Sequence, residues 1–249
     1  MVFSVQAGVT QLVGCDLSKV DVAGSNPVSR SNHPTVMINR PVVLAGLVLL
    51  ASLSVFAQDY KVENISSAAP DLPAAYASAI QSQGYRVSGP KGPWVEIWLA
   101  KSITTGSKPA DDAIVLPVAQ GTLLGVIRFP GQAYDRRGQT IKAGVYTLRY
   151  SNYPVDGAHQ GVAPQRDFGL MTPIAGDADP AATPAFEALV QQSTKASGTP
   201  HPAVLSLESP ASGATFPSVV TEGDNGDQVL NVKAGSLPLA IVVVGKVQG

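Results

Sequence analysis

The chain has 249 residues, and 17 Lys and Arg against 18 Asp and Glu give a formal net charge of -1. Only 14% of the residues are charged and 45% are apolar, while 24 Gly and 20 Pro suit a turn-rich β protein better than a helical bundle. This composition excludes a disordered polyelectrolyte. It also argues against nucleic acid as the partner, because phosphate binding requires a dense face of Lys and Arg.

Residues 7–31 resemble the conceptual translation of a transfer-RNA gene. The T-arm DNA, read in frame, gives the Gly-Ser-Asn-Pro of residues 24–27, and the D-arm gives the Thr-Gln-Leu-Val of residues 10–13. The two blocks are separated by about the distance between these arms in a transfer RNA. We therefore expect residues 1–36 to be a spurious extension and Met37 to be the true start. The alternative is an ordinary polar N-terminal extension.

Residues 37–57 have the layout of a secretory signal peptide. Residues 37–40 form a short positive segment, and residues 41–57 are an uncharged apolar stretch that ends in small residues suited to cleavage. We expect cleavage before Gln58 and a periplasmic or secreted protein that meets the membrane only during export. The alternative is an uncleaved anchor to the inner membrane through residues 41–57, although a span needs about 20 apolar residues.

The single cysteine of the chain, Cys15, lies in the expected extension. Residues 58–249 therefore contain no thiol, so the mature chain has no disulfide, no cysteine metal ligand and no cysteine nucleophile. A chain of this length can bury a sufficient hydrophobic core without disulfide bonds. We expect residues 58–249 to form a single domain.

Short runs rich in β-branched or aromatic residues, bounded by Gly, Pro, Asp or Asn, predict a series of strands. These runs cover residues 85–88, 93–100, 113–118, 122–129, 145–150, 203–208, 229–233 and 239–247. Regular helices do not alternate with them, which argues against parallel βαβ units. The pattern predicts a mainly β fold, an antiparallel β-sandwich of the jelly-roll or immunoglobulin-like type.

Two short helices are expected at the edges of this sandwich. Asp71 is the N-cap candidate of the first helix, and Gly84 follows its end. Thr183 is the N-cap candidate of the second helix, with Pro184 at its first position and Gly198 at its end.

The strand at residues 146–150, introduced by residues 141–144, is similar to strands in uncharacterised secreted bacterial β-sandwich proteins. Residues 156–159 and 166–168 share this resemblance, which covers about residues 85–207. The resemblance implies a sandwich fold and export. It implies no particular activity.

The segment 152–179 predicts a long loop, and loops of this length in compact domains are usually functional or poorly ordered. Asp156 and His159 stand three residues apart and can meet one cation, with Asp167 or His201 completing the set of ligands. Imidazole and carboxylate ligands suit zinc or another divalent metal. A divalent metal is the cofactor that this set predicts, and the sequence points to no other.

Arg166 in the same segment offers a planar guanidinium group that can bind a carboxylate or phosphate of a ligand. The alternative is structural. In that case Arg166 pairs with Asp156 or Asp167, and His159 caps a turn.

Alternation along residues 93–100 predicts that Trp94, Glu96 and Trp98 share one face of a strand. Two indoles with a carboxylate between them can stack against sugar rings or another planar ligand. The alternative is that the helix after Asp71 covers this face, so that both tryptophans belong to a second small core.

The sequence contains no Gly-x-Ser-x-Gly elbow, phosphate loop, dinucleotide fingerprint or His-Glu-x-x-His motif. We therefore expect an exported, non-enzymatic binding or accessory domain whose ligand is an unknown small molecule or glycan. One alternative is a metal-dependent hydrolase that uses Asp156, His159 and His201. Another is a structural protein of the cell envelope.

Overall fold

A computed structural model describes the following parts of the chain: residues 60–103, 105, 116–153 and 166–245. The chain divides into two compact units, residues 1–53 and residues 54–249, and every described residue belongs to the second unit. The expected extension at residues 1–36 and the expected signal peptide at residues 37–57 lie outside the described residues.

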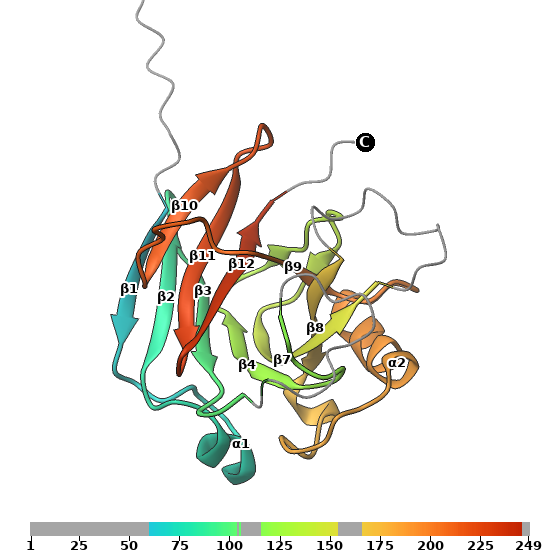
Figure 1. The fold of residues 1–249 in the computed structure, drawn as a ribbon. Helices are drawn as coiled ribbons and strands as arrows, with labels where there is room; N and C mark the ends of the chain where they lie inside the picture. Colours follow the sequence, from blue (N-terminus) through green and yellow to red (C-terminus); the bar gives the residue numbers. More distant parts are fainter. Residues whose placement is uncertain (1–59, 104, 106–115, 154–165, 246–249) are drawn as a thin grey trace, which may run out of the picture. The chain divides into compact units, whose positions relative to one another are not determined.

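The described residues form one ten-stranded sheet and a separate two-stranded hairpin. The ten strands are β1 (Lys61–Ile65), β2 (Gly84–Gly89), β3 (Gly92–Leu99), β4 (Leu123–Phe129), β7 (Gly144–Asn152), β8 (Asp167–Pro173), β9 (Val204–Glu208), β10 (Ser218–Glu222), β11 (Asp227–Ala234) and β12 (Leu237–Val244). The hairpin strands are β5 (Ala133–Tyr134) and β6 (Thr140–Ile141). Neighbouring strands are antiparallel, in the order β1-β2-β3-β4-β7-β8-β9-β12-β11-β10 (Figure 1).

The sheet curls because β9 changes partner along its length. Its first half pairs with β8, where Val204 lies opposite Leu170, and its second half pairs with β12, where Leu207 lies opposite Ile241. Strands that change partner in this way form the corners of orthogonally packed sheets. At the two edges of the sheet, Cα atoms of β1 and β10 approach within 8 Å. The sheet is therefore a nearly closed barrel.

The predicted antiparallel, mainly β fold with two helices is confirmed. The expected sandwich has two stacked sheets. The described strands instead form one continuous hydrogen-bonded sheet, because β9 joins its two halves. The expected strand at 113–118 is also corrected where it is described: Val118 makes only an isolated bridge with Thr105.

Three strands of the sheet, β1, β8 and β10, were absent from the sequence prediction. Strand β8 lies inside the segment 152–179 that was expected to be a loop. Its sequence contains Gly169 and only one β-branched residue, Thr172, so it carries little of the usual strand signal. Its place between β7 and β9 is set by tertiary pairing.

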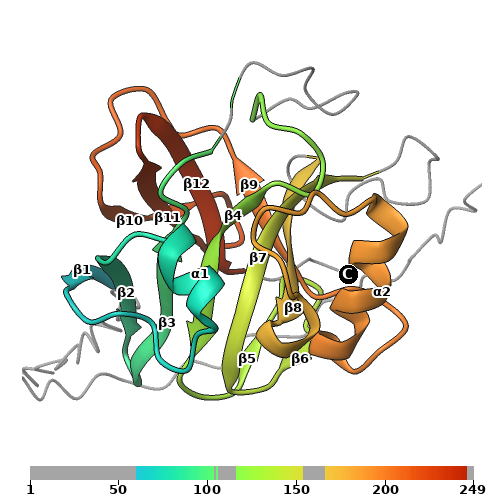
Figure 2. The same cartoon turned by 90° about the horizontal axis from the view of Figure 1, so that it is seen from below.

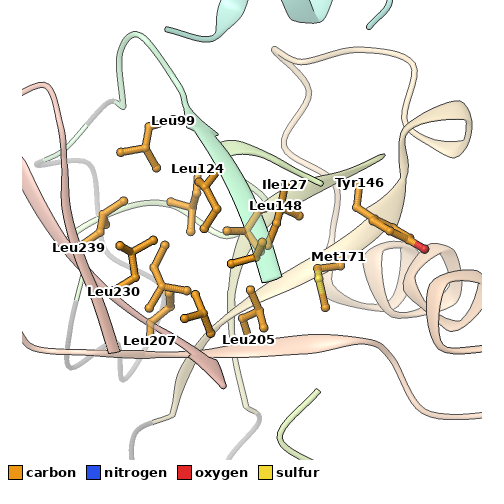
Figure 3. Packing of buried hydrophobic residues seen from close by; sticks show 14 of the residues in the cluster. Leu99, Leu124, Ile127, Tyr146, Leu148, Met171, Leu205, Leu207, Leu230 and Leu239 are labelled. Atoms are coloured by element: carbon orange, nitrogen blue, oxygen red, sulfur yellow. The ribbon is translucent and has the colours of Figure 1, made fainter. Parts of the chain in front are cut away.

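The main hydrophobic core fills the inside of the curled sheet. Alternate residues such as Leu148 of β7 and Ile241 of β12 point inward and are fully buried. Figure 3 shows side chains of β3, β4, β7, β9, β11 and β12 meeting in this interior. Because every second residue of a strand points outward, the outer face needs separate cover.

Helix α1 (Ala74–Ala79) covers part of the outer face (Figure 2). Its Tyr76 is buried in a small cluster that also contains Trp98. The helix begins after Pro73 instead of Asp71, because Asp71 has a φ of 55° in the left-handed region and lies outside the helix.

Helix α2 (Phe186–Ser197) covers the outer face of β8, where its apolar side packs against Leu170 (Figure 2). It begins after Ala185 instead of the expected Thr183. It ends at the expected Gly198, whose φ of 66° lies in the left-handed region that favours glycine. Among the described residues, no helix has the length and apolar character that a bilayer span requires.

A buried ion pair fixes the chain between β8 and α2 onto the outer face of the sheet. Arg149 of β7 is fully buried, and its Nε and Nη2 donate to the two carboxylate oxygens of Asp177 at 2.6 and 3.0 Å. The remaining N–H groups donate to the backbone oxygens of Gly121, Asp179 and Ala182. Every N–H group of the guanidinium therefore has an acceptor.

Both members of this pair stay charged. Burial alone raises the pKa of Asp177, but the hydrogen bonds from Arg149 and Thr147 outweigh it and hold this pKa below its ordinary value. Arg149 also bonds the hydroxyl of Tyr76 at 3.2 Å, which links helix α1 to the same network.

We expect Arg149→Ala to lower the free energy of unfolding by about 3–5 kcal/mol, because it leaves the Asp177 carboxylate buried without its cation. The measurement is urea denaturation followed by circular dichroism. The matched control is Arg128→Ala, which removes a half-exposed arginine whose partner Glu96 keeps a second arginine, Arg86. Its expected loss is about 1 kcal/mol or less. Equal losses in the two variants would contradict the role given to Arg149.

Candidate functional site

The two tryptophans of β3 lie in different surroundings. The register between β2 and β3 shifts between Val87 and Ser88, which makes Trp94 the extra residue of a β-bulge. A bulge re-aims the side chain of its extra residue. Trp94 accordingly packs against the inner core, and its Nε1 donates to the carbonyl oxygen of Val243 in β12 at 2.8 Å.

Trp98 lies in the outer cluster and is 1% exposed. Its Nε1 donates to the carbonyl oxygen of Ser67 at 2.9 Å, and its indole lies so close to Gly84 that a Cβ there would approach the ring to 2.6 Å. Helix α1 covers this indole through Tyr76, so the alternative of a second small core holds for Trp98 but not for Trp94, which packs against the inner core. The expected shared face of Trp94 and Trp98 is therefore wrong, since the bulge separates the two indoles.

Glu96 lies between the tryptophans and is 3% exposed. Its carboxylate oxygens accept hydrogen bonds from Arg86 of β2 and Arg128 of β4, both at 2.8 Å. Arg86 also pairs with Glu63 of β1, so opposite charges face each other across four neighbouring strands. Such cross-strand pairs stabilise a sheet. Glu96 is occupied by this ladder instead of facing a ligand.

The structure separates two of the predicted metal ligands, Asp167 and His201. Asp167 begins β8, is fully buried and accepts a hydrogen bond from the hydroxyl of Tyr150 at 2.5 Å. The backbone N–H of Met171 donates to the carbonyl oxygen of Ala203. Met171 lies four residues after Asp167 in β8, which is roughly 13 Å along the strand at the usual rise per residue. His201 is exposed and lies beyond Ala203. A metal set that contains both Asp167 and His201 is therefore wrong.

The other predicted metal ligands, Asp156 and His159, lie outside the described residues. Within the part of the chain that the structure describes, no three His, Cys, Asp or Glu side chains gather closely enough to hold a metal ion. Arg166 lies where β8 begins, and both its Nε and its Nη2 donate to the carbonyl oxygen of Tyr153. This contact ties the guanidinium group to the backbone at the end of β7, whereas the structural alternative had paired Arg166 with Asp156 or Asp167.

A cavity of about 340 Å³ lies at the end of the barrel where the β2–β3 turn meets the start of β1. Besides two glycines, its described lining consists of Tyr60, Pro90, Lys91, Pro93, Trp94 and Gln132. The cavity thus combines two aromatic rings and two prolines with one amide and one ammonium group. Trp94 is the only predicted site residue in this lining.

The local geometry keeps the two rings of this cavity in place. The ring of Tyr60 lies directly over Gly89, where an added Cβ would approach it to 2.5 Å. Burial raises the pKa of Tyr60, so its hydroxyl is neutral at physiological pH. The N–H of Trp94 already bonds Val243, so this residue offers a ligand its ring surface instead of a donor. No sequence pattern predicts this pairing, because Tyr60 precedes β1 and Trp94 belongs to β3, more than thirty residues later.

A second cavity, of about 620 Å³, lies at the opposite end of the barrel beside helix α1. Its described lining consists of small Ser, Ala and Thr residues with Pro180, Leu123 and Lys101, and contains no aromatic ring. The ammonium group of Lys101 donates to the carbonyl oxygen of Ser78 at 2.7 Å. Because no aromatic residue is among these lining residues, this cavity offers a ligand no flat ring to stack on.

Carboxylates from β9, β10 and β11 lie near one another and near an arginine of the β5–β6 turn. Arg136, in the turn between β5 and β6, lies 2.7 Å from Asp227 of β11. Glu208 at the end of β9 interacts with Glu222 of β10 and with Asp227. Burial, followed by repulsion from Glu222, raises the pKa of Glu208 above its ordinary value. The cluster ties the β5–β6 hairpin to the sheet.

We expect Glu208→Gln to raise the free energy of unfolding at about pH 7. The raised pKa means that the folded state binds the Glu208 proton more tightly than the unfolded chain does. The stability that the protonated carboxyl contributes is present below the ordinary glutamate pKa and is lost as the pH rises through the raised pKa of Glu208. The difference in stability between Glu208→Gln and the parent should therefore vanish at about pH 4. Urea denaturation at both pH values measures it. The control is Glu187→Gln, at an exposed glutamate, which should not gain stability at either pH. If Glu208→Gln were stabilised equally at both pH values, the expectation would be contradicted.

We expect Trp98→Ala to lower the free energy of unfolding by about 3–5 kcal/mol, since it empties a fully buried indole site. Trp94→Phe should cost less, because it keeps a ring in the half-buried position and loses mainly one hydrogen bond, worth about 0.5–1.5 kcal/mol. Thermal and urea denaturation of both variants measure the difference. A Trp98→Ala variant as stable as the parent would show that this indole is not buried.

Comparison of the chain with protein-family models, with curated proteins and with solved structures gave no match. The resemblance to uncharacterised secreted β-sandwich proteins and the transfer-RNA interpretation of residues 7–31 stay predictions. The functional argument therefore rests on the chemistry of the described residues.

Proposed function

We propose that this chain is an exported, non-enzymatic binding domain that holds a sugar ring, or another small planar ligand, in the cavity of Tyr60 and Trp94. Export is supported by the apolar pattern of residues 37–57, which is typical of a signal peptide. The protein then works in the periplasm or outside the cell, and its partner is a small molecule or a glycan.

The observation that carries this proposal is the aromatic lining of the 340 Å³ cavity. Small-molecule sites measure about 300–1,000 Å³ and combine apolar and aromatic walls with a few polar groups. Here Tyr60 and Trp94 supply the aromatic surface, while Gln132 and Lys91 supply the polar groups. Planar or ring-shaped ligands gain most from such a lining, because flat surfaces exclude water from each other over a large area.

The alternative of a metal-dependent hydrolase has less support. Of its three expected ligands, His201 is exposed. Its remaining ligands, Asp156 and His159, lie outside the described residues. No described feature favours a purely structural role in the cell envelope over ligand binding.

The test is isothermal titration calorimetry of the full chain with glucose, galactose, mannose and N-acetylglucosamine, and with oligosaccharides of each. We expect saturable binding of at least one sugar, and a loss of affinity of about tenfold or more in Trp94→Ala, which corresponds to about 1.4 kcal/mol. Trp94→Phe should keep most of the affinity because it keeps a flat ring.

Lys101→Ala is the matched control, because Lys101 lines the cavity at the other end of the barrel. It should bind the same sugar with unchanged affinity. The proposal fails if none of these sugars binds, or if Trp94→Ala binds as the parent does while keeping its melting temperature.

A further inference from the structure

An exposed aromatic ring lies beside the proposed site. Tyr134 of β5 is 48% exposed, and among the described residues only Val220 is another large hydrophobic residue with comparable exposure, at 37%. A flat ring in this position exposes apolar surface to water at a cost. A single exposed apolar residue is ordinary on a protein surface, so it is the link to the cavity that distinguishes Tyr134.

A hydrogen bond joins Tyr134 to the wall of the cavity. The Nε2 of Gln132 donates to the hydroxyl oxygen of Tyr134 at 2.6 Å, and Gln132 itself lines the cavity. Both residues belong to the short connection between β4 and β6, so backbone and side chains together hold the ring near the rim. The amide of Gln132 therefore links the ring of Tyr134 to the lining of the cavity.

The size of the cavity indicates that a ligand of several rings would reach beyond it. Its volume of about 340 Å³ lies at the lower end of the range for small-molecule sites, so a ligand of several rings extends beyond it. Among the described residues, Tyr134 is an exposed aromatic residue that a hydrogen bond joins to this lining, through Gln132. A second ring of the same ligand can stack on it as the first ring stacks on Trp94.

We propose that Tyr134 forms a second stacking subsite and that the ligand is an oligosaccharide of two or more units. This inference rests on the proposed function and extends it from a single ring to a chain.

A proline-rich peptide is the other kind of chain that aromatic residues bind, and the observations favour it less. The polyproline II backbone has no internal hydrogen bonds, so its carbonyl groups need donors from the binding groove. The N–H of Trp94 bonds Val243 and one N–H of Gln132 Nε2 bonds Tyr134, which leaves the Lys91 ammonium and the second N–H of Gln132 as donors in the described lining. A sugar has hydroxyl groups that both donate and accept, so it depends less on donors in the wall.

The experiment compares, by calorimetry with the full chain, each monosaccharide of the panel with its di-, tri- and tetrasaccharide. We expect the affinity of the parent protein to rise about tenfold or more from one unit to several. Tyr134→Ala should lose this gain and keep the affinity for the monosaccharide, while Tyr134→Phe keeps the ring and most of the gain. Val220→Ala, at the other exposed apolar residue, should change neither affinity.

The outcomes separate this inference from the function on which it rests. If monosaccharides bind at Trp94 and longer sugars bind no tighter, or if Tyr134→Ala keeps the full gain, the second subsite is overturned and the binding function stands. If no sugar of any length binds, both fail. Tight binding of a proline decamer in place of the sugars would likewise overturn the inference in favour of a peptide ligand.

Discussion

The ion pair of Arg149 and Asp177 is the interaction on which the outer face of this protein depends. Inside the barrel, hydrophobic side chains meet from opposite strands and need no other cover. Outside, β7 carries polar Thr147 and Arg149, and both bind Asp177 from the chain that follows β8. Burying a charged arginine is costly unless its donors are satisfied. Here the satisfied donors position the chain that leads to α2 and, through Tyr76, helix α1.

Much of the fold could be predicted from the sequence, since strands with alternating or continuous apolar residues were found close to their true bounds. The prediction failed where tertiary pairing makes a strand from a weak sequence, as in β8 with its Gly169 and single Thr172. It also failed on the arrangement of the strands. The change of partner within β9, between Ser206 and Leu207, leaves no mark in composition, yet it turns two expected sheets into one barrel.

The candidate site could be predicted less well, and for a related reason. Strict alternation placed Trp94 and Trp98 together, but one extra residue in a bulge sends Trp94 toward Val243 and leaves Trp98 in the outer cluster. Polar residues of the expected loop, Asp167 and Arg166, proved to be held by Tyr150 and Tyr153. A cavity is built by residues from distant parts of a chain, so its lining is not visible in a sequence pattern.

Two glycines of β2 make the same kind of contact with an aromatic ring, and the two rings have different surroundings. At Gly84 and at Gly89 the missing side chain lets an aromatic ring lie against the backbone, that of Trp98 in the first case and that of Tyr60 in the second. Helix α1 covers the first ring, which is 1% exposed and serves stability. None of the described helices covers the second, which lines a cavity. The difference between the buried Trp98 and the cavity-lining Tyr60 therefore comes from the helix that covers one ring and not the other.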